Sequence, residues 1–295
     1  MKGIILAAGK GTRLGAATCG IGSNGVGVSK PLIPTYDKPT IYYPLSDLIS
    51  AGINDILIIA APNSIDQFRA HLGDGTELGI SIQYAIQDVP RGTADAFLIA
   101  EEFIGNDDVA LIFGDNIFSS SRFAEILRSS TKPEGATVFA YQVPDPQDYG
   151  VVEFSEDGRA ISIEEKPAQP KSDYAVVGVY FYTNGVIDIA KQLTPSDRGE
   201  LEITDVNKTY LEAETLNVVK LDTDTEWFDT GTPKTLLSAA NYVEKFQGEN
   251  EQLLGSPEAA AYTAGFINSA QLTELAKSLI KSEYGRLLHK LANTN

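Results

Sequence analysis

The feature that most constrains this chain is a short apolar segment near its beginning, followed at once by a glycine-rich loop. Residues 4–6 are apolar, and a short apolar run bounded by glycines predicts a buried β-strand. The residues at 7, 8, 9 and 11 are alanine or glycine, so an anion can approach the backbone N–H groups of the loop closely. Arg13 adds a planar, permanently charged group suited to phosphate oxygens. The loop predicts a phosphate site; the alternative is a tight strand-to-helix turn with a surface arginine.

Two familiar phosphate-binding motifs do not fit this loop. The dinucleotide motif G-x-G-x-x-G would need a glycine where Leu14 stands. The P-loop pattern G-x-x-x-x-G-K-[ST] has no match here either. The loop alone therefore does not identify the ligand, and the rest of the chain has to do so.

The charge balance limits the partners of this chain. Its 295 residues lie near the upper bound for one hydrophobic core and allow an appended subdomain. The net charge is −17, with 40 acidic and 23 basic residues, which argues against nucleic acid or an anionic membrane as a partner. A phosphate site in such a chain must bring several of its few cationic side chains together, against the net negative charge of the protein.

Cysteine and histidine are scarce, which excludes several kinds of site. Cys19 is the single cysteine, so no intrachain disulfide framework is possible and a reducing compartment is expected. His71 and His289 are the two histidines, and a His-based metal site or a Ser-His-Asp triad is not expected. No apolar run approaches the ~20 residues of a membrane span, and the segment before the first strand is too short for a signal sequence. We expect a soluble, cytoplasmic protein.

The first half of the chain alternates strand and helix patterns. Strands are expected at 56–59, 80–86 and 109–113, and helices at 39–51, 64–73 and 93–103. Strands separated by helices of about ten residues imply parallel βαβ units. Right-handed crossovers then put helices on both faces of the sheet. The glycine-rich segment 15–28 is expected to be mobile.

The second half is more mixed and ends in helices. Strands are expected at 136–143, 151–154, 160–163, 176–182 and 218–221, and helices at 186–192, 203–212, 234–246 and in the tail from 257 onward. The predicted fold class is α/β: a Rossmann-like, mixed and largely parallel sheet with helices on both faces, plus a C-terminal helical subdomain. The core is expected at 1–232, with halves of about 1–118 and 119–232, and the helical subdomain at 233–295.

Two aspartates suggest a divalent cation site. Asp115 directly follows a predicted buried strand, where ligands bind in doubly wound sheets. Asp229 stands between an apolar pair and a helix start. Mg²⁺ commonly binds one or two carboxylates, with waters and substrate phosphates completing its shell. The hypothesis is that Asp115 and Asp229 form one Mg²⁺ site; turn or helix-cap roles are the alternative.

Two further strand ends carry candidate binding groups. Glu165 could accept hydrogen bonds from sugar hydroxyls while Lys166 meets a phosphate as a point charge. Gln87 offers both a donor and an acceptor to the edge of a base, and Gly92 could admit a flat ring near the backbone. An exposed charge pair at a strand end is the alternative for the first group.

Several segments together resemble one enzyme family over almost the whole chain. The loop LAAGKGTRL at 6–14 and SKPLIP at 29–34 are similar to the signature of the sugar-nucleotide pyrophosphorylases. The segments YDKPTIYYPL at 36–45, AYQVPDPQDYGVVEF at 140–154, ISIEEKP at 161–167 and RGELEITDVN at 198–207 resemble glucose-1-phosphate thymidylyltransferases. The resemblance runs from residue 3 to about residue 290. It is far more specific than any single loop.

The resemblance implies a role for each candidate residue. The nucleotide half would bind dTTP through Ala8, Gly9, Gly11, Thr12, Arg13, Lys30, Gln87, Gly92 and Asp115. The other half would bind glucose 1-phosphate through Asn116, Gly150, Glu165, Lys166, Val176 and Trp227. Arg13, Lys30, Asp115, Lys166 and Asp229 would be catalytic, with Mg²⁺ on Asp115 and Asp229. The family also implies a homo-oligomer.

The implied reaction is dTTP + glucose 1-phosphate → dTDP-glucose + pyrophosphate, the first step toward dTDP-rhamnose and other deoxysugars. The chain departs from the family pattern where Ala8 replaces a glycine, in a longer gap between Arg13 and Lys30, and in the segment PRGTAD at 90–95. The last departure leaves a UTP-dependent uridylyltransferase as one alternative. A non-catalytic regulator that binds nucleotide sugars is the other.

Overall fold

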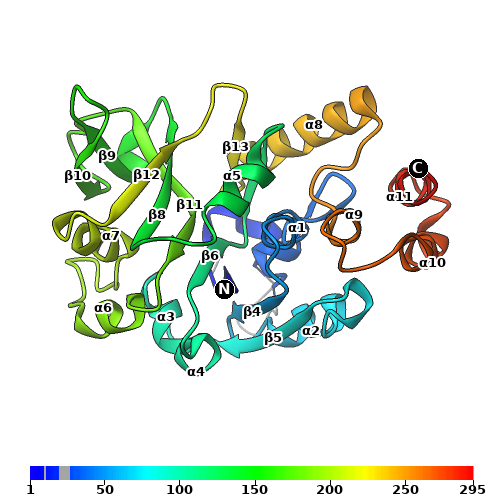
Figure 1. The fold of residues 1–295 in the computed structure, drawn as a ribbon, viewed down its shortest axis with the longest axis horizontal. Helices are drawn as coiled ribbons and strands as arrows, with labels where there is room; N and C mark the ends of the chain where they lie inside the picture. The colour runs from blue at the N-terminus through cyan, green and yellow to red at the C-terminus, as the bar shows by residue number, and fades with distance from the viewer. Residues whose placement is uncertain (10, 20–26, 295) are drawn as a thin grey trace.

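A mixed β-sheet forms the centre of the molecule (Figure 1). The computed structural model describes residues 1–9, 11–19 and 27–294. In this part of the chain the sheet has nine strands, in the order β10-β9-β11-β6-β1-β4-β5, with β8 on β11 and β12 on β8. These strands are β1 (Lys2–Ala7), β4 (Asp55–Ala60), β5 (Ser81–Ile86), β6 (Val109–Phe113), β8 (Ala136–Gln142), β9 (Gly150–Phe154), β10 (Ala160–Glu165), β11 (Tyr174–Tyr182) and β12 (Leu216–Lys220).

The N-terminal half of the sheet is parallel, as its βαβ pattern predicts. Strand β1 pairs in parallel with β4 and β6, and β4 pairs in parallel with β5. Strand β11 then runs antiparallel to β6, β8 and β9, which makes the whole sheet mixed. The carboxyl ends of β1 and β6 therefore open onto the same edge of the sheet.

Helices cover both faces of the sheet. Neighbouring residues of β1 point to opposite faces, so Ile5 joins the apolar cluster on one side and Ile4 the cluster on the other. The apolar cluster on the first face includes residues of α1 (Tyr42–Ser50), α2 (Ile65–Leu72), α5 (Phe123–Ser129), α9 (Pro257–Thr263), α10 (Ser269–Leu279) and α11 (Glu283–Ala292). The second is covered by α3 (Asp95–Ile99), α4 (Glu101–Ile104), α6 (Val186–Gln192) and α7 (Ile203–Glu212). The predicted α/β architecture is confirmed.

Some elements were not expected from the sequence. The helix expected over 93–103 is two short helices, α3 and α4, which meet at Ala100 because its backbone leaves the helical region there. Two small sheets lie outside the main one: β2 (Pro34–Thr35) with β3 (Lys38–Pro39), and β7 (Asn116–Ser119) with β13 (Glu226–Asp229). Four short 3-10 helices are described: η1 (Thr12–Ala17), η2 (Lys30–Leu32), η3 (Thr76–Leu78) and η4 (Pro146–Asp148).

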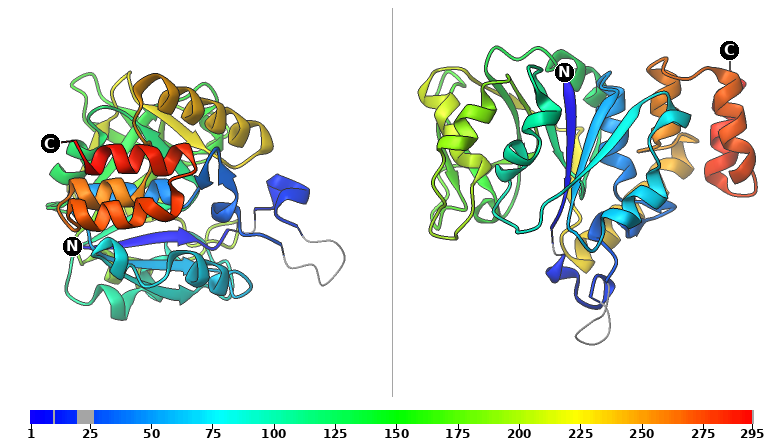
Figure 2. Two further views of the ribbon diagram at one scale, coloured as in Figure 1. Left: turned by 90° about the vertical axis from the view of Figure 1, so that its right-hand side faces the viewer. Right: turned by 90° about the horizontal axis from the view of Figure 1, so that it is seen from below.

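The C-terminal part is helical, as expected. Helix α8 (Pro233–Asn250) starts with a capping box in which the side chains of Thr232 and Thr235 each accept from the other's backbone N–H. Pro233 occupies the first turn, where its missing N–H costs nothing. Helices α10 and α11 lie outside α9, on the side away from the sheet (Figure 2). Their apolar residues share one cluster with α1, and the boundary at residue 233 stays a prediction.

Three further expectations concern the glycine-rich segment, membrane-spanning helices, and the cysteine and histidine residues. Residues 20–26 of the glycine-rich segment lie outside the described residues, and so does the mobility expected there. Among the described helices, none combines the length and the apolar character that crossing a bilayer requires. Cys19, His71 and His289 are all exposed.

Candidate active site

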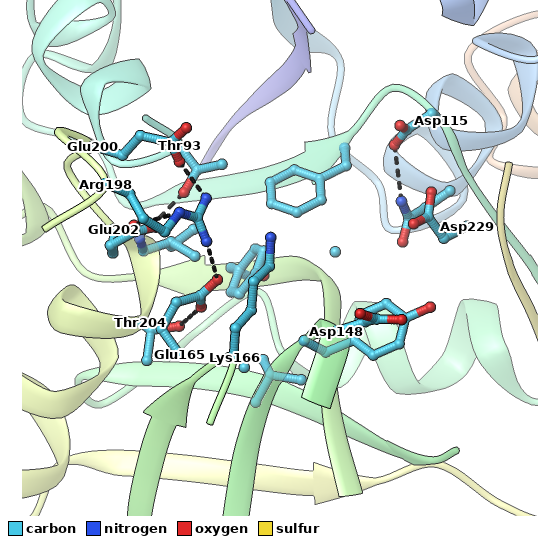
Figure 3. A pocket seen from close by; sticks show the side chains of 18 of the residues that line it. Thr93, Asp115, Asp148, Glu165, Lys166, Arg198, Glu200, Glu202, Thr204 and Asp229 are labelled. Carbon is cyan, nitrogen blue, oxygen red and sulfur yellow. Dashed lines mark hydrogen bonds and ion pairs between the residues drawn. The ribbon is translucent and has the colours of Figure 1, made fainter. Parts of the chain in front are cut away.

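A cavity of about 300 Å³ opens beyond the carboxyl end of β6. Nine of the residues singled out from the sequence line it: Arg13, Asp115, Asn116, Gly150, Glu165, Lys166, Val176, Trp227 and Asp229. Figure 3 shows Asp115 and Asp229 at one end of this cavity, Arg198 and Glu165 at the other, and Lys166 between them. The structure thus brings the two predicted carboxylates and three cationic side chains around a single space.

The small sheet β7–β13 places the two aspartates side by side. Asp115 lies in the tight connection between β6 and β7, and Asp229 ends β13, opposite Asn116 in the antiparallel register. Thr230 strengthens the junction, because its backbone N–H and its hydroxyl both donate to the Asp115 carbonyl, at 3.2 and 2.9 Å. This pairing joins residues that are more than one hundred positions apart in the chain.

Two cations converge on these carboxylates. The Lys30 ammonium is an ion-pair partner of Asp115 and lies 3.4 Å from Asp229 Oδ1. Arg13 Nη2 lies 3.7 Å from Asp229 Oδ2. Gly231 makes room for the guanidinium, because a Cβ there would stand 2.7 Å from Arg13 Nη2. Lys30 is almost fully buried, whereas Arg13 is exposed and free to reach a ligand.

The carboxylate of Asp229 is held in a poor environment for negative charge. Burial raises its pKa, and the neighbouring charge of Asp115 raises it further, while Lys30 and Arg13 act in the opposite direction. The site therefore favours additional positive charge next to this pair. Among the described residues, no three His, Cys, Asp or Glu side chains gather as a protein-only metal cage. A divalent cation at Asp115 and Asp229 would take its other ligands from water or phosphate oxygens.

The opposite end of the cavity has a second charged group, in which Glu165 was predicted from the sequence and Arg198 was not. Arg198 Nη1 lies 3.4 Å from Glu165 Oε1, its Nη2 lies 2.6 Å from Glu200, and its Nε lies 3.6 Å from Glu202. Thr204 donates to Glu165 Oε2 at 2.6 Å. The sequence signal was present, since Arg198 opens one of the segments that carry the family resemblance.

Lys166 projects into the middle of the cavity from the end of β10. Its backbone is in the left-handed region, with φ of 43°, which is uncommon for a residue with a side chain. Its N–H donates to the Tyr149 carbonyl at 2.9 Å. The side chain is exposed and lies between the two charged ends of the cavity (Figure 3). A non-glycine residue held in this conformation at a cavity is consistent with a functional position.

A second cavity, of about 280 Å³, is lined by three of the other predicted nucleotide residues. Ala8, Gly9 and Gln87 line it, together with Asp88 and Pro90. The predicted residues Gly11, Thr12, Lys30 and Gly92 are not among the residues that line either cavity.

Gly92 lies against this chain's own backbone, and its expected contact with a base stays a prediction. Its φ is +108°, and a Cβ there would stand 2.4 Å from the Leu201 carbonyl oxygen. The side of Gly92 on which a Cβ would stand is therefore filled by this chain's own backbone, and a glycine is required by the close approach of Leu201.

The fold and the site together define a class of enzyme. The sheet carries a glycine-rich loop after β1, a carboxylate pair formed by Asp115 after β6 and Asp229 at the end of β13, and cations on both sides of one cavity. The family model described as Nucleotidyl transferase matches residues 2–245. The class is therefore that of the nucleotidyltransferases.

Similar proteins narrow the class. A glucose-1-phosphate thymidylyltransferase of Neisseria meningitidis is 51% identical over 292 residues, covering 99% of both chains. One from Mycobacterium tuberculosis is 48% identical, covering 100% of both chains. A crystal structure described as a glucose-1-phosphate thymidylyltransferase of Bacillus anthracis is 39% identical, with a TM-score of 0.72 over 82% of this chain and 94% of that chain. This chain belongs to the glucose-1-phosphate thymidylyltransferases within the nucleotidyl transferase family.

A more distant structure shares the fold. A UDP-glucose pyrophosphorylase crystallised with UDP-glucose superposes with a TM-score of 0.71 at 23% identity. The match covers 83% of this chain and 98% of that chain. At this identity the match is informative about the architecture alone.

Proposed function

We propose that this enzyme transfers a thymidylyl group from dTTP to α-D-glucose 1-phosphate and releases pyrophosphate. The observation that carries the proposal is the single cavity with cationic side chains at both ends and a carboxylate pair at one of them. Such a cavity suits two mutually repelling phosphate ligands in one site. The full-length similarity to glucose-1-phosphate thymidylyltransferases supports this choice of substrates.

The proposed chemistry requires no general base. The second pKa of a phosphate monoester is about 6, so the sugar phosphate is mostly a dianion at neutral pH. One of its phosphate oxygens forms a bond to the α-phosphorus of dTTP. The bond between that phosphorus and the oxygen that bridges the α- and β-phosphorus atoms breaks. The electron pair leaves with pyrophosphate. The main obstacle is repulsion between the two anions, so charge compensation and orientation provide most of the catalysis.

Each cation has a proposed place in this reaction. Arg13 and Lys30 neutralise the triphosphate beside Asp115 and Asp229. Lys166, between the two ends, meets the phosphate of the sugar, and Arg198 holds Glu165 for hydrogen bonds to the sugar hydroxyls. Charged hydrogen bonds of this kind are about twice as strong as neutral ones.

We propose that Asp115 and Asp229 hold Mg²⁺. Two adjacent carboxylates, one of which has a pKa raised by burial and by the other's charge, are a donor set that a hard dication suits. When bound, Mg²⁺ would supply positive charge that offsets the repulsion between the two phosphate-bearing substrates. Lys30, now paired with both aspartates, is then free to turn toward the triphosphate.

The second cavity is the proposed base site, with Gln87 as the polar group proposed to meet the base and the Ala8–Gly9 segment also in its lining. Uracil and thymine present the same hydrogen-bonding edge, so UTP remains the alternative nucleotide.

We also propose that the enzyme works as a homo-oligomer in the cytoplasm, as its family implies. Light scattering of the purified protein measures its mass in solution and so tests whether it is a homo-oligomer.

The test is pyrophosphate release with dTTP or UTP, and with glucose 1-phosphate or other sugar 1-phosphates, with and without Mg²⁺. We expect the highest rate for dTTP with glucose 1-phosphate, and loss of turnover when EDTA is added. Asp115→Ala should abolish turnover, while Asp157→Ala, at an exposed turn, should leave it unchanged. Binding of nucleotide sugars without turnover of any pair would instead favour the regulator.

A further inference from the structure

Gln87 lies between the proposed base site and a buried aspartate. It directly follows β5, lines the second cavity and is 6% exposed. Its amide nitrogen Nε2 donates to Asp95 Oδ2 at 2.9 Å and to the Gly92 carbonyl at 3.3 Å. Both hydrogens of the amide group are therefore committed to partners inside the protein.

The chemistry of Asp95 fixes which end of the Gln87 amide faces it. An ionised carboxylate and a backbone carbonyl only accept hydrogen bonds, so the NH₂ end must point toward them. Among the described residues, no hydrogen bond reaches Gln87 Oε1 from the protein side. The acceptor end of the amide is thus the end left for a ligand in the cavity.

The position of Asp95 is itself well held. Asp95 is 1% exposed, and its Oδ1 lies 2.9 Å from Nη2 of Arg91, four residues earlier in the chain, as an ion pair. Two backbone hydrogen bonds join the segment 91–94 to Leu201. The Leu201 N–H donates to the Arg91 carbonyl at 2.7 Å, and the Ala94 N–H donates to the Leu201 carbonyl at 3.0 Å. Burial, the ion pair and these backbone hydrogen bonds together hold the Asp95 carboxylate toward Gln87.

We propose that Asp95 is a positioning residue that fixes the polarity of Gln87, so that the base site selects pyrimidines with an N3–H donor. Thymine and uracil carry this donor, whereas cytosine presents an acceptor at N3. To accommodate cytosine, the amide would have to turn over, which would place Gln87 Oε1 against Asp95 Oδ2 and the Gly92 oxygen. Three acceptors without a donor between them would lose the buried hydrogen bonds of this network. The inference rests on the proposed function only in placing the base in this cavity.

The test compares kcat/KM for dTTP and dCTP, each with glucose 1-phosphate, in the wild type and in Asp95→Asn. An asparagine can donate as well as accept, so Gln87 can adopt either orientation in this variant. We expect the dTTP-to-dCTP ratio to fall at least about tenfold, with the KM for glucose 1-phosphate unchanged. Asp95→Glu keeps the carboxylate and should keep the preference. Asp66→Asn, at an exposed position on α2, is the matched change in charge and should leave the ratio as in the wild type.

An unchanged ratio in a folded Asp95→Asn protein would overturn the inference. If that variant fails to fold, the wild type decides through N3-methyl-dTTP, which lacks the donor; equal use of this analogue and dTTP would refute the role of Gln87 Oε1. A wild type that makes no pyrophosphate from dTTP contradicts the proposed function instead. In that case calorimetric titration with dTTP and dCTP still tests the polarity of the site.

Discussion

Trp227 donates its indole N–H to the side-chain oxygen of Asn116 over 2.7 Å, across the small β7–β13 sheet. The amide nitrogen of Asn116 in turn donates to Asp115 Oδ1 at 3.0 Å. An indole can only donate and a carboxylate can only accept, so both ends of the asparagine amide are fixed. The three residues form a relay that orients the Asp115 carboxylate.

Trp227→Phe should therefore impair catalysis without unfolding the protein. Loss of one hydrogen bond of this kind corresponds to about 0.5–1.5 kcal/mol, so we expect kcat/KM to fall roughly 2- to 10-fold. Steady-state kinetics at saturating Mg²⁺ measure the effect. Tyr242→Phe is the matched control, because it removes a donor to Ser119 on the same small sheet, at 3.0 Å and outside the cavity. Equal losses in both variants would contradict the relay.

Arg198→Ala should weaken the use of the sugar phosphate. The substitution frees Glu165 and removes a cation from one end of the cavity. Hydrogen bonds to charged groups contribute about 1.5–3 kcal/mol, so we expect kcat/KM for glucose 1-phosphate to fall roughly 10- to 100-fold. The KM for dTTP should change much less. Arg159→Ala, which removes an exposed arginine paired with Asp157, should leave both parameters unchanged.

Lys38 is a buried cation that joins the β2–β3 segment to the C-terminal helices. Its ammonium donates to Gln247 Oε1 at 3.0 Å and lies 5.0 Å from the centre of the Tyr43 ring and 5.4 Å from that of Tyr284. Burial lowers the pKa of Lys38, against the opposing charges of Asp37 and, more weakly, Glu258. The folded protein thus binds this proton less tightly than the unfolded chain does.

The sign of the pH dependence follows from this shift. Between the lowered pKa of Lys38 in the folded protein and about 10.4 in the unfolded chain, the unfolded chain carries more protons, so stability rises with pH. We expect the free energy of unfolding of the wild type to rise relative to Lys38→Met as the pH approaches this value. Burial raises the pKa of both Tyr43 and Tyr284, so these phenols keep their protons in the same range.

Denaturant titrations at several alkaline pH values measure this difference. Lys245→Met is the control, because Lys245 is exposed and pairs only with Glu249 at 3.9 Å among the described residues. The difference between this control and the wild type should stay constant with pH. A constant difference for Lys38→Met as well would show that the buried lysine keeps an ordinary pKa.

Leu272→Ala tests whether the C-terminal helices fold as a separate unit. Leu272 of α10 is fully buried in the cluster that also contains Ile5 of β1 and Leu45 of α1. Removal of such a side chain costs about 2–5 kcal/mol. We expect one cooperative transition, shifted by this amount, in both far-UV circular dichroism and fluorescence. Trp227 is the single tryptophan and reports on the active site.

A separate helical subdomain would give a different result. The circular dichroism would then show an early transition in Leu272→Ala, while the Trp227 fluorescence transition would stay where the wild type has it. Leu237→Ala, at a position of α8 that is 62% exposed, controls for the change in composition and should shift neither transition.

The sequence determined the architecture of this protein and the chemical nature of its site. Local patterns sufficed for β1, for the parallel half of the sheet and for α6 and α7, because apolar periodicity and turn residues act over a few positions. Arg13 and Lys166 lie in segments that carry the family resemblance, and the positions of Asp115 after a strand and of Asp229 before a helix start indicated the two aspartates.

Tertiary structure alone decided which of these residues meet. Lys30 and Asp229 are 199 positions apart, and the residues that β7 pairs with in β13 are more than one hundred positions away, so no local pattern records either contact. Three other contacts were likewise decided by the tertiary structure alone. They are the ion pairs of Arg198, the close approach of Leu201 to Gly92, and the hydrogen bond from Gln87 to Asp95. Charge and hydrogen-bond capacity are properties of single residues, whereas their pairing depends on how the whole sheet brings distant segments together.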